Sequence, residues 1–262
     1  WINDSWYYNN ELVQFTAHTG GVTRREHQYF LEPSRDWKAF WDLYSNYGKN
    51  ADHMHELAVA QGDKSLEAIS LTFKALYFAN MTDMFGSVPY EEACSGRKVG
   101  GTLTPKYNTQ KEVYQFLFAD LEAANDLYAT NPTFLHPAMD GMYNGNMAKW
   151  RKFNNSLYLR LLCRVSGRSE MNVGTKMTEI IGNPSKYPVF TSNDDNATVK
   201  YSGNDPYINT FGTTTESDFT QSGRKLTRQL IGMTVVTENG NQVYVDPRLP
   251  IIGKKNTVVA DN

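Results

Sequence analysis

A cluster of potential metal ligands lies at Asp52, His53, His55 and Glu56. Zinc sites use imidazole and carboxylate ligands, so these residue types raise the hypothesis of a metal site. The surrounding residues predict a helix, on which His53 and His55 point about 200° apart and cannot hold one ion from the same face. Pairing of Glu56 with either His53 or Asp52 is compatible with that helix. We therefore predict a solvated helix face and no metal site.

Acidic residues elsewhere offer further oxygen ligands and potential acid–base pairs. Asp194 and Asp195, between Asn193 and Asn196, lack the spacing of a calcium loop, so we predict a turn. A glycoside hydrolase needs two carboxyl groups at a defined separation, and 28 Asp and Glu residues leave that alternative open. The fingerprints of serine hydrolases, zinc proteases, phosphate loops and dinucleotide sites do not occur. No residue is predicted to be catalytic, and no cofactor is expected.

Aromatic residues in predicted loops are the best candidates for ligand contact. Rings in loops are harder to explain as core than rings at helical spacing, and they can stack on sugars or anchor a partner. The alternative is that they fold back as plugs over helix ends. The candidate ligand-binding residues are Tyr7, Tyr8, His27, Tyr29, Phe30 and Tyr143.

The composition limits the classes of function that remain. The chain has 262 residues, with 26 Lys and Arg against 28 Asp and Glu. This balance gives no basic field for nucleic acid, so no nucleic-acid partner is expected. Aromatic residues reach 13% although the mean hydropathy is −0.55, which suggests that some rings face water. The two cysteines, Cys94 and Cys163, fit neither a disulfide scaffold nor a CxxC site.

Apolar residues at intervals of three or four predict a helical part from about residue 32 to 183. The first long helix follows Ser34 and carries an aromatic stripe over 37–58 that includes Tyr47. A second helix spans 63–85. The short break at Gln61-Gly62 between them predicts an antiparallel hairpin.

Three more helices are predicted farther along the chain. Thr109 and Glu112 have the spacing of a capping box that begins the third helix. The fourth spans 147–165, and a shorter fifth follows Ser169 and ends at Gly182. Helix hairpins in series are typical of a tetratricopeptide-like stack, although the repeat consensus is absent.

The residues from about 184 to 262 are rich in Asn, Asp, Gly, Ser and Thr. Short apolar alternations around Val235 and Val243 predict small strands, and 221–231 is predicted as a helix. No clean domain boundary is visible. We predict one mainly α domain over 1–262, built of tetratricopeptide-like helix pairs with an irregular, loop-rich C-terminal part carrying short strands.

The connection between the second and third helices has a sequence that specifies its shape. It begins with Phe85-Gly86-Ser87-Val88-Pro89-Tyr90. Gly86 can stop the helix in a left-handed conformation, Pro89 cannot resume it, and Val88 before proline is driven to extended geometry.

These residues, with several others, resemble the SusD/RagB family of outer-membrane nutrient-binding lipoproteins. The resemblance covers nearly the whole chain, and the 85–90 and 246–250 motifs taken together are its most specific part. The similar segments are 37–44, 85–90, 113–124, 150–164, 187–197 and the Asp-Pro-Arg-Leu-Pro sequence at 246–250.

The resemblance implies a Bacteroidetes-type protein of the outer membrane that faces the cell exterior and covers a SusC-like TonB-dependent transporter. Its helical repeats would contact the transporter, and its loop-rich part would hold an oligosaccharide or a peptide. The lipid-bearing cysteine of such proteins is absent, and relatives continue well beyond the 246–250 motif. We therefore expect the chain to be incomplete at both ends, with membrane association through an N-terminal lipid anchor not present in this chain.

We expect a cell-surface nutrient-binding protein without enzymatic activity, and glycan is the preferred ligand. Aromatic faces can stack on sugar C–H surfaces while Asn, Asp and Arg side chains bond the hydroxyl groups. Two alternatives stay open. One is a helical-repeat scaffold for protein interactions, and the other is a glycoside hydrolase.

Overall fold

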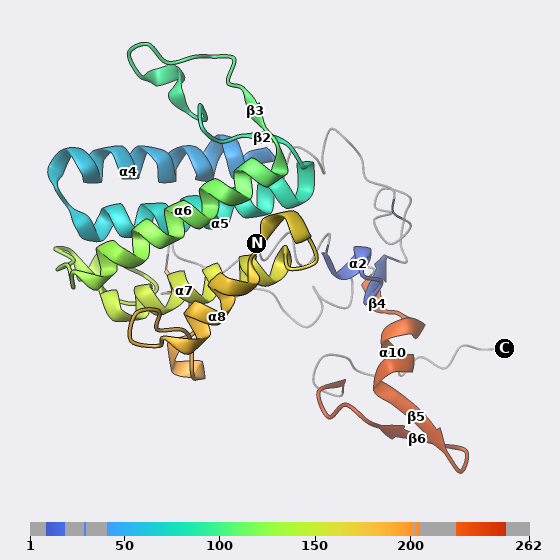
Figure 1. Cartoon of the computed structure of the whole chain (residues 1–262). Coiled ribbons are helices and arrows are strands. Elements are labelled where there is room, and N and C mark those ends of the chain that lie inside the picture. Colours follow the sequence, from blue (N-terminus) through green and yellow to red (C-terminus); the bar gives the residue numbers. More distant parts are fainter. Residues whose placement is uncertain (1–8, 19–28, 30–40, 202, 205–223, 250–262) are drawn as a thin grey trace. The chain divides into compact units, whose positions relative to one another are not determined.

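The computed structural model describes residues 9–18, 29, 41–201, 203–204 and 224–249, which are mainly helical (Figure 1). The chain divides into two compact units, Ser34–Lys200 and the combination of Trp1–Pro33 with Tyr201–Asn262. The change in composition near residue 184 falls inside the larger unit, in which Lys200 N–H donates to the carbonyl of Gly141 at 3.4 Å.

The first two helices of the larger unit form the predicted hairpin. Helix α4 (Lys49–Gln61) lies beside α5 (Lys64–Phe85) in Figure 1. Gly62, with φ 69°, ends α4 in the left-handed conformation that glycine adopts easily. The Asp63 carboxylate then accepts the N–H groups of Ser65 and Leu66, both at 3.0 Å, and so begins α5.

A π-helical segment, η4 (Leu43–Gly48), lies within the predicted aromatic stripe and precedes α4. A π-turn holds more residues than the 3.6 of an α-turn, so the side-chain spacing changes locally, but Ala51 and Ala58 beyond it are buried as the stripe predicts. Tyr44 packs edge-on against Phe78, with ring centres 5.8 Å apart, but Tyr47 is 53% exposed. Tyr47 nevertheless lies beside Tyr77 of α5, with ring centres 5.7 Å apart, so it belongs to the predicted stripe at its exposed edge. Residues 34–40 of the predicted first helix lie outside the described residues.

The third helix, α6 (Gln110–Ala129), begins at the predicted capping box. The Thr109 hydroxyl accepts the N–H of Glu112 at 3.3 Å, and the Glu112 carboxylate accepts the N–H of Thr109 at 2.7 Å. Both terminal donors are thus satisfied, and the prediction is confirmed.

The last two helices of this unit are α7 (Met147–Arg164) and α8 (Gly174–Gly182). Asn146 caps α7 by accepting the N–H of Lys149 at 3.1 Å. Helix α8 begins later than predicted because a 3-10 turn, η7 (Ser169–Met171), takes up the first residues after Ser169. Further 3-10 turns are η5 (Ser95–Arg97), η6 (Pro137–Met139) and η8 (Asn193–Asp195), the last being the predicted turn at the paired aspartates.

Helix α5 is central in this unit, because it contacts α4, α6 and α7. Ala68 and Ala75 are fully buried on it, and such small side chains permit close helix approach. Leu117 and Leu121 of α6 and Leu161 of α7 complete the centre of the core. The mainly α class and the helix pairs are as predicted.

The segment after α5 has the predicted sharp shape but a different backbone conformation at its glycine. Gly86 has φ 73° and ψ −109°, so its φ is positive but its ψ is not that of a left-handed helical residue. The Thr82 hydroxyl donates to the Gly86 carbonyl at 2.6 Å and fixes this bend. Strand β2 (Val88–Pro89) then pairs antiparallel with β3 (Tyr107–Asn108).

The smaller unit is built from short elements. Strand β1 (Thr16–His18), after the helical turn α2 (Asn10–Leu12), pairs antiparallel with β4 (Arg224–Leu226). Helix α10 (Arg228–Thr234) is followed by the hairpin of β5 (Val235–Glu238) and β6 (Asn241–Tyr244). The two predicted strand regions are therefore confirmed.

The predicted helix over 221–231 is wrong in its first half. Residues 224–226 pair with β1, and the helix begins only after Thr227, whose hydroxyl accepts the N–H of Leu230 at 3.2 Å. This pairing joins residues that are far apart in the chain, so local periodicity could not reveal it. Residues 221–223 lie outside the described residues.

We predict that Gly86→Val lowers the free energy of unfolding by about 1 to 3 kcal/mol, since a β-branched residue is strained at this positive φ. A Cβ at Gly86 would meet no atom within 4 Å, so the cost is conformational strain and not a clash. Denaturant unfolding measures it.

Gly167→Val is the matched control, because Gly167 also has open space around it but no positive φ. Equal denaturant midpoints for the two variants would show that the bend at Gly86 does not need glycine.

Candidate functional site

The predicted ligand-binding residues fall into three groups. Tyr7, Tyr8, His27 and Phe30 lie outside the described residues. Tyr29 belongs to the smaller unit and is 66% exposed, with φ 57°. Its exposure is compatible with ligand contact and does not fit a buried plug. The ligand role of this whole set stays a prediction.

Tyr143, the remaining candidate, is 8% exposed in the larger unit. Its hydroxyl donates to the carbonyl of Asp195 at 2.9 Å, and its ring meets Trp150 edge-on at 5.5 Å. Burial raises the pKa of the Tyr143 phenol. These contacts favour the alternative in which a loop ring packs as a plug on a helix.

Asp140 organises the loop that carries Tyr143. One carboxylate oxygen accepts the N–H groups of Met142 and Tyr143, at 3.0 and 3.1 Å. The other accepts the N–H of Gly145 at 2.9 Å and the indole N–H of Trp150 at 2.8 Å. Four donors therefore hold this loop against the first turn of α7.

A series of aromatic rings crosses the larger unit, and sequence reasoning placed these rings in the core or left them unassigned. We call it the aromatic strip; its members, in spatial order, are Tyr47, Tyr77, Phe73, Trp150, Phe153 and Phe190. Successive ring centres are 5.7, 5.8, 5.3, 6.0 and 6.2 Å apart.

The rings of the aromatic strip differ in exposure. Tyr47 is 53% exposed and Phe73, Tyr77, Phe153 and Phe190 are half-buried. Trp150, by contrast, is 2% exposed. The Phe73–Tyr77 pair is nearly parallel, at 10°, as is Phe153–Phe190, at 14°. In each stacked pair the rings turn one face toward each other, so a sugar could cover only the part of these rings that stays exposed.

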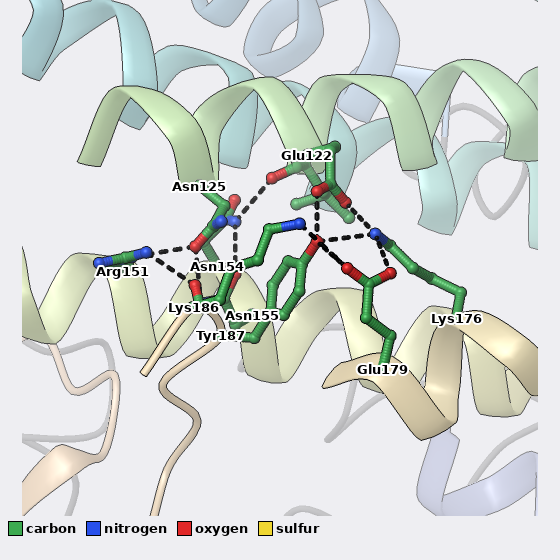
Figure 2. Close-up of polar contacts among 10 residues, drawn as sticks. Glu122, Asn125, Arg151, Asn154, Asn155, Lys176, Glu179, Lys186 and Tyr187 are labelled. Atoms are coloured by element: carbon green, nitrogen blue, oxygen red, sulfur yellow. Dashed lines mark hydrogen bonds and ion pairs between the residues drawn. The ribbon is translucent and has the colours of Figure 1, made fainter. Parts of the chain in front are cut away.

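The densest polar network joins α6, α7, α8 and the turn at 183–188 (Figure 2). At its centre is Tyr187, whose side chain is fully buried. The Tyr187 hydroxyl contacts carboxylate oxygens of Glu122, at 2.5 Å, and Glu179, at 3.1 Å. Lys176 Nζ bonds the same hydroxyl at 2.8 Å and lies 2.7 and 2.9 Å from Glu122 and Glu179.

The electrostatics of this network oppose acid catalysis by Glu179. Hydrogen bonds from Lys176 and Lys186 lower the pKa of Glu179 to about 2. Burial lowers the pKa of Lys176, but its bonds to Glu122, Tyr187 and Glu179 outweigh that effect and raise it. The Glu179 carboxylate is thus held in its charged form by cationic partners. The acid of a glycosidase needs the opposite, a raised pKa. The network stabilises the packing of α8.

Adjacent asparagines of α7 extend the network toward the core. Asn154 Nδ2 donates to the Leu121 carbonyl at 2.9 Å, and Asn155 Nδ2 donates to Asn125 Oδ1 at 3.0 Å and to the Pro188 carbonyl at 3.1 Å. The Arg151 guanidinium also donates to Asn125 Oδ1, at 3.0 Å. Sequence reasoning missed these contacts because they join residues about 30 positions apart.

The 52–56 cluster is engaged by a neighbouring loop. Arg97 and Lys98, from the connection that projects past α4 between β2 and β3 in Figure 1, form ion pairs with both Asp52 and Glu56. His53 Nδ1 is 3.6 Å from Glu56 Oε2, as the sequence allowed. Within the described ranges, no three His, Cys, Asp or Glu side chains are grouped so that they could hold a metal ion.

Two other arrangements could suggest catalysis. Ser70 Oγ lies 3.3 Å from His55 Nδ1, but Ser70 is fully buried and donates to the Glu67 carbonyl at 2.7 Å, so it is no accessible nucleophile. Burial raises the pKa of Asp120, which accepts the Tyr90 hydroxyl and lies 3.8 Å from Lys74 Nζ. These bonds hold Asp120 in the packing between α5, β2 and α6.

A comparison with protein families identifies the class. Residues 2–262 match a SusD-like family described as starch-binding and associating with the outer membrane. The chain belongs to this SusD-like family. The description of this family names a binding function and an association with the outer membrane. A comparison with curated proteins found no match.

Solved structures with the same fold include several SusD homologues. A chitin-binding protein is 26% identical, with a TM-score of 0.68, and the match covers 86% of this chain and 46% of that one. A SusD homologue from Bacteroides fragilis is 28% identical, with a TM-score of 0.60, over 76% of this chain and 40% of that one. A chitin-binding SusD homologue from Flavobacterium johnsoniae, 21% identical, has a TM-score of 0.71 over 88% of this chain and 46% of that one. The chain thus spans less than half the length of these proteins.

No helix in the described part of the chain is both long enough and apolar enough to cross a membrane.

We predict that acid weakens the α8 packing through Glu179. The folded pKa, about 2, lies below the ordinary 4.5, so the stabilisation is complete above 4.5 and is lost as the pH falls toward 2. Glu179→Gln removes the titrating group. Thermal melts should show a smaller loss of Tm for this variant than for the unmodified chain over that pH range.

The control is Glu91→Gln, which removes an exposed carboxylate that forms no ion pair with another residue in the described part of the chain. If Glu179→Gln and Glu91→Gln had the same acid dependence, the ion pairs around Tyr187 would not contribute to stability.

Proposed function

We propose that this protein binds a glycan at the cell surface and delivers it to a TonB-dependent outer-membrane transporter, without cleaving it. The observation that carries the proposal is the SusD-like family match over residues 2–262, whose description combines starch binding with the outer membrane. The similarity to a chitin-binding protein at 26% identity also supports a carbohydrate ligand. A lipid anchor on the full-length protein and a SusC-like partner are parts of this proposal.

The side chains on the described surface are compatible with binding rather than turnover. At the two ends of the aromatic strip Tyr47 is exposed and Phe190 is half-buried, while the carboxylates around Tyr187 are held in ion pairs. Sugars are commonly held by a ring face together with polar groups, and both kinds of group occur in this unit.

The proposal predicts binding without product release. Chito-oligosaccharides, starch oligosaccharides and peptides would be titrated calorimetrically, and each mixture would then be analysed for cleavage by chromatography. We expect heat of binding with at least one oligosaccharide and no cleavage product.

Steady product release that disappears in Asp120→Asn would identify a hydrolase, because Asp120 is the described carboxyl group with a raised pKa. A chain that ignores every sugar and peptide but co-purifies with a TonB-dependent transporter would support the protein-interaction scaffold instead.

We further predict that Tyr29→Ala weakens glycan binding by about 1 to 2 kcal/mol, the scale of a lost aromatic contact. Both residues carry a Cβ, so the strain of the positive φ at this position is nearly matched. Because Tyr29 is 66% exposed, the melting temperature should change little. Calorimetric titration and thermal melting of the one variant measure both quantities.

Tyr107→Ala is the control, since Tyr107 is similarly exposed, at 56%, in the larger unit. If Tyr29→Ala lowered the free energy of unfolding by about 3 kcal/mol or more, Tyr29 would be a packed plug. Unchanged affinity and an unchanged melt would move the ligand contact to other rings, the aromatic strip first.

A further inference from the structure

A polar cavity of about 300 Å³ lies where the end of α5, the beginning of α6 and the end of α7 meet. Three cationic side chains line it, Lys111, Arg164 and Arg168, together with two carboxylates, Asp83 and Glu170. None of these residues belongs to the predicted ligand-binding set or to the aromatic strip. The cavity therefore raises the separate question of what it holds.

The charges in the cavity are only partly matched. Asp83 accepts the Tyr114 hydroxyl at 2.6 Å and the Arg164 Nε–H at 3.0 Å, so this carboxylate and Arg164 neutralise each other. Lys111 and Arg168 form no ion pair with any residue that the structure describes, and Glu170 is exposed. With three cations and two carboxylates, the lining has a net excess of one positive charge, and Lys111 and Arg168 are the two cations without an ion-pair partner among the described residues.

The dipoles of the helix ends do not by themselves explain the positive charge of the cavity. The positive end of α6 is close to Lys111, but α5 and α7 bring their negative ends to the same cavity. Gln110 Nε2 donates to the Thr82 carbonyl at 2.7 Å, which also accepts the Gly86 N–H at 2.8 Å, so this carbonyl near the end of α5 has two donors. The side chains of Lys111 and Arg168 must therefore supply the attraction for an anion.

We propose that this cavity is a subsite for an acidic sugar, with Lys111 and Arg168 binding its anionic group. The volume suits one sugar residue, and the polar lining suits its hydroxyl groups. Arginine matches a carboxylate or sulfate with two parallel N–H donors, and lysine adds a point charge. This inference rests on the proposed glycan-binding function and adds the charge class of the ligand.

The test is calorimetric titration of the chain at low salt with glucuronate, with glucose as the uncharged match, and with inorganic sulfate. Glucuronate should bind at least about tenfold more tightly than glucose, a difference that salt of about 0.5 M should largely remove. The double variant Lys111→Gln, Arg168→Gln should lose about tenfold in glucuronate affinity. Both side chains are at the surface, so its thermal melt should match that of the unmodified chain.

Lys64→Gln is the matched control, because Lys64 is an exposed lysine at the opposite end of α5. It should leave glucuronate binding unchanged. The variant Arg168→Lys, which keeps the charge but loses the paired donors, should fall between the double variant and the unmodified chain.

Each other result counts against the inference. Sulfate binding as tight as glucuronate binding would assign the cavity to inorganic anions and overturn the sugar subsite. Neutral oligosaccharide binding with no preference for the acid, unaffected by the double variant, would overturn the subsite and leave the proposed function standing. If no saccharide bound, neutral or acidic, both the subsite and the proposed glycan-binding function would be overturned.

Discussion

The buried amide groups of Asn154 and Asn155 set the register in which the helices of the larger unit pack. Both side chains are fully buried, so their donors and acceptors must find partners inside the protein. Asn154 Oδ1 accepts the Thr72 hydroxyl of α5 at 2.9 Å, and Asn154 Nδ2 donates to the Leu121 carbonyl of α6. A shift of any of these helices by one residue would leave buried polar groups unpaired, which costs more than a lost apolar contact.

The surface features depend on this register. Trp150, one turn before Asn154 on α7, links the two accessible ends of the aromatic strip. Asn155 reaches the Pro188 carbonyl and so positions the chain that leads to Phe190 at the end of the strip. At the far end of α7, Arg164 meets Asp83 of α5 and shapes the cavity. One set of interior bonds therefore places both accessible surfaces.

Local features of this fold could be predicted from sequence, and long-range ones could not. The capping box at Thr109 and the stop at Gly62 are determined within a few residues, and both were predicted correctly. The π-helical segment at 43–48 could not be predicted, because the apolar spacing of the stripe continues through it to Ala51 and Ala58. The 221–231 helix was mispredicted because Arg224–Leu226 pairs with a strand about 200 residues earlier in the chain. For the site, sequence reasoning favoured loop rings as ligand contacts, and Tyr143 instead fits the alternative that it left open, a ring that packs as a plug. It also missed the cavity, whose residues come from three helix ends.

The bonds around Tyr187 have a consequence for chemical labelling of this surface. Amine-reactive reagents attack only unprotonated lysine, and the raised pKa of Lys176 makes that form scarce. Its Nζ is also surrounded by Glu122, Glu179 and the Tyr187 hydroxyl, which obstruct the approach of a reagent. Lys111, with no such partners among the described residues, has none of this protection. When lysines of the protein are cross-linked to its partners, Lys111 at the beginning of α6 should thus react, whereas Lys176 of α8 should not. A missing cross-link at Lys176 would then reflect its ion pairs and would not indicate that a partner covers it.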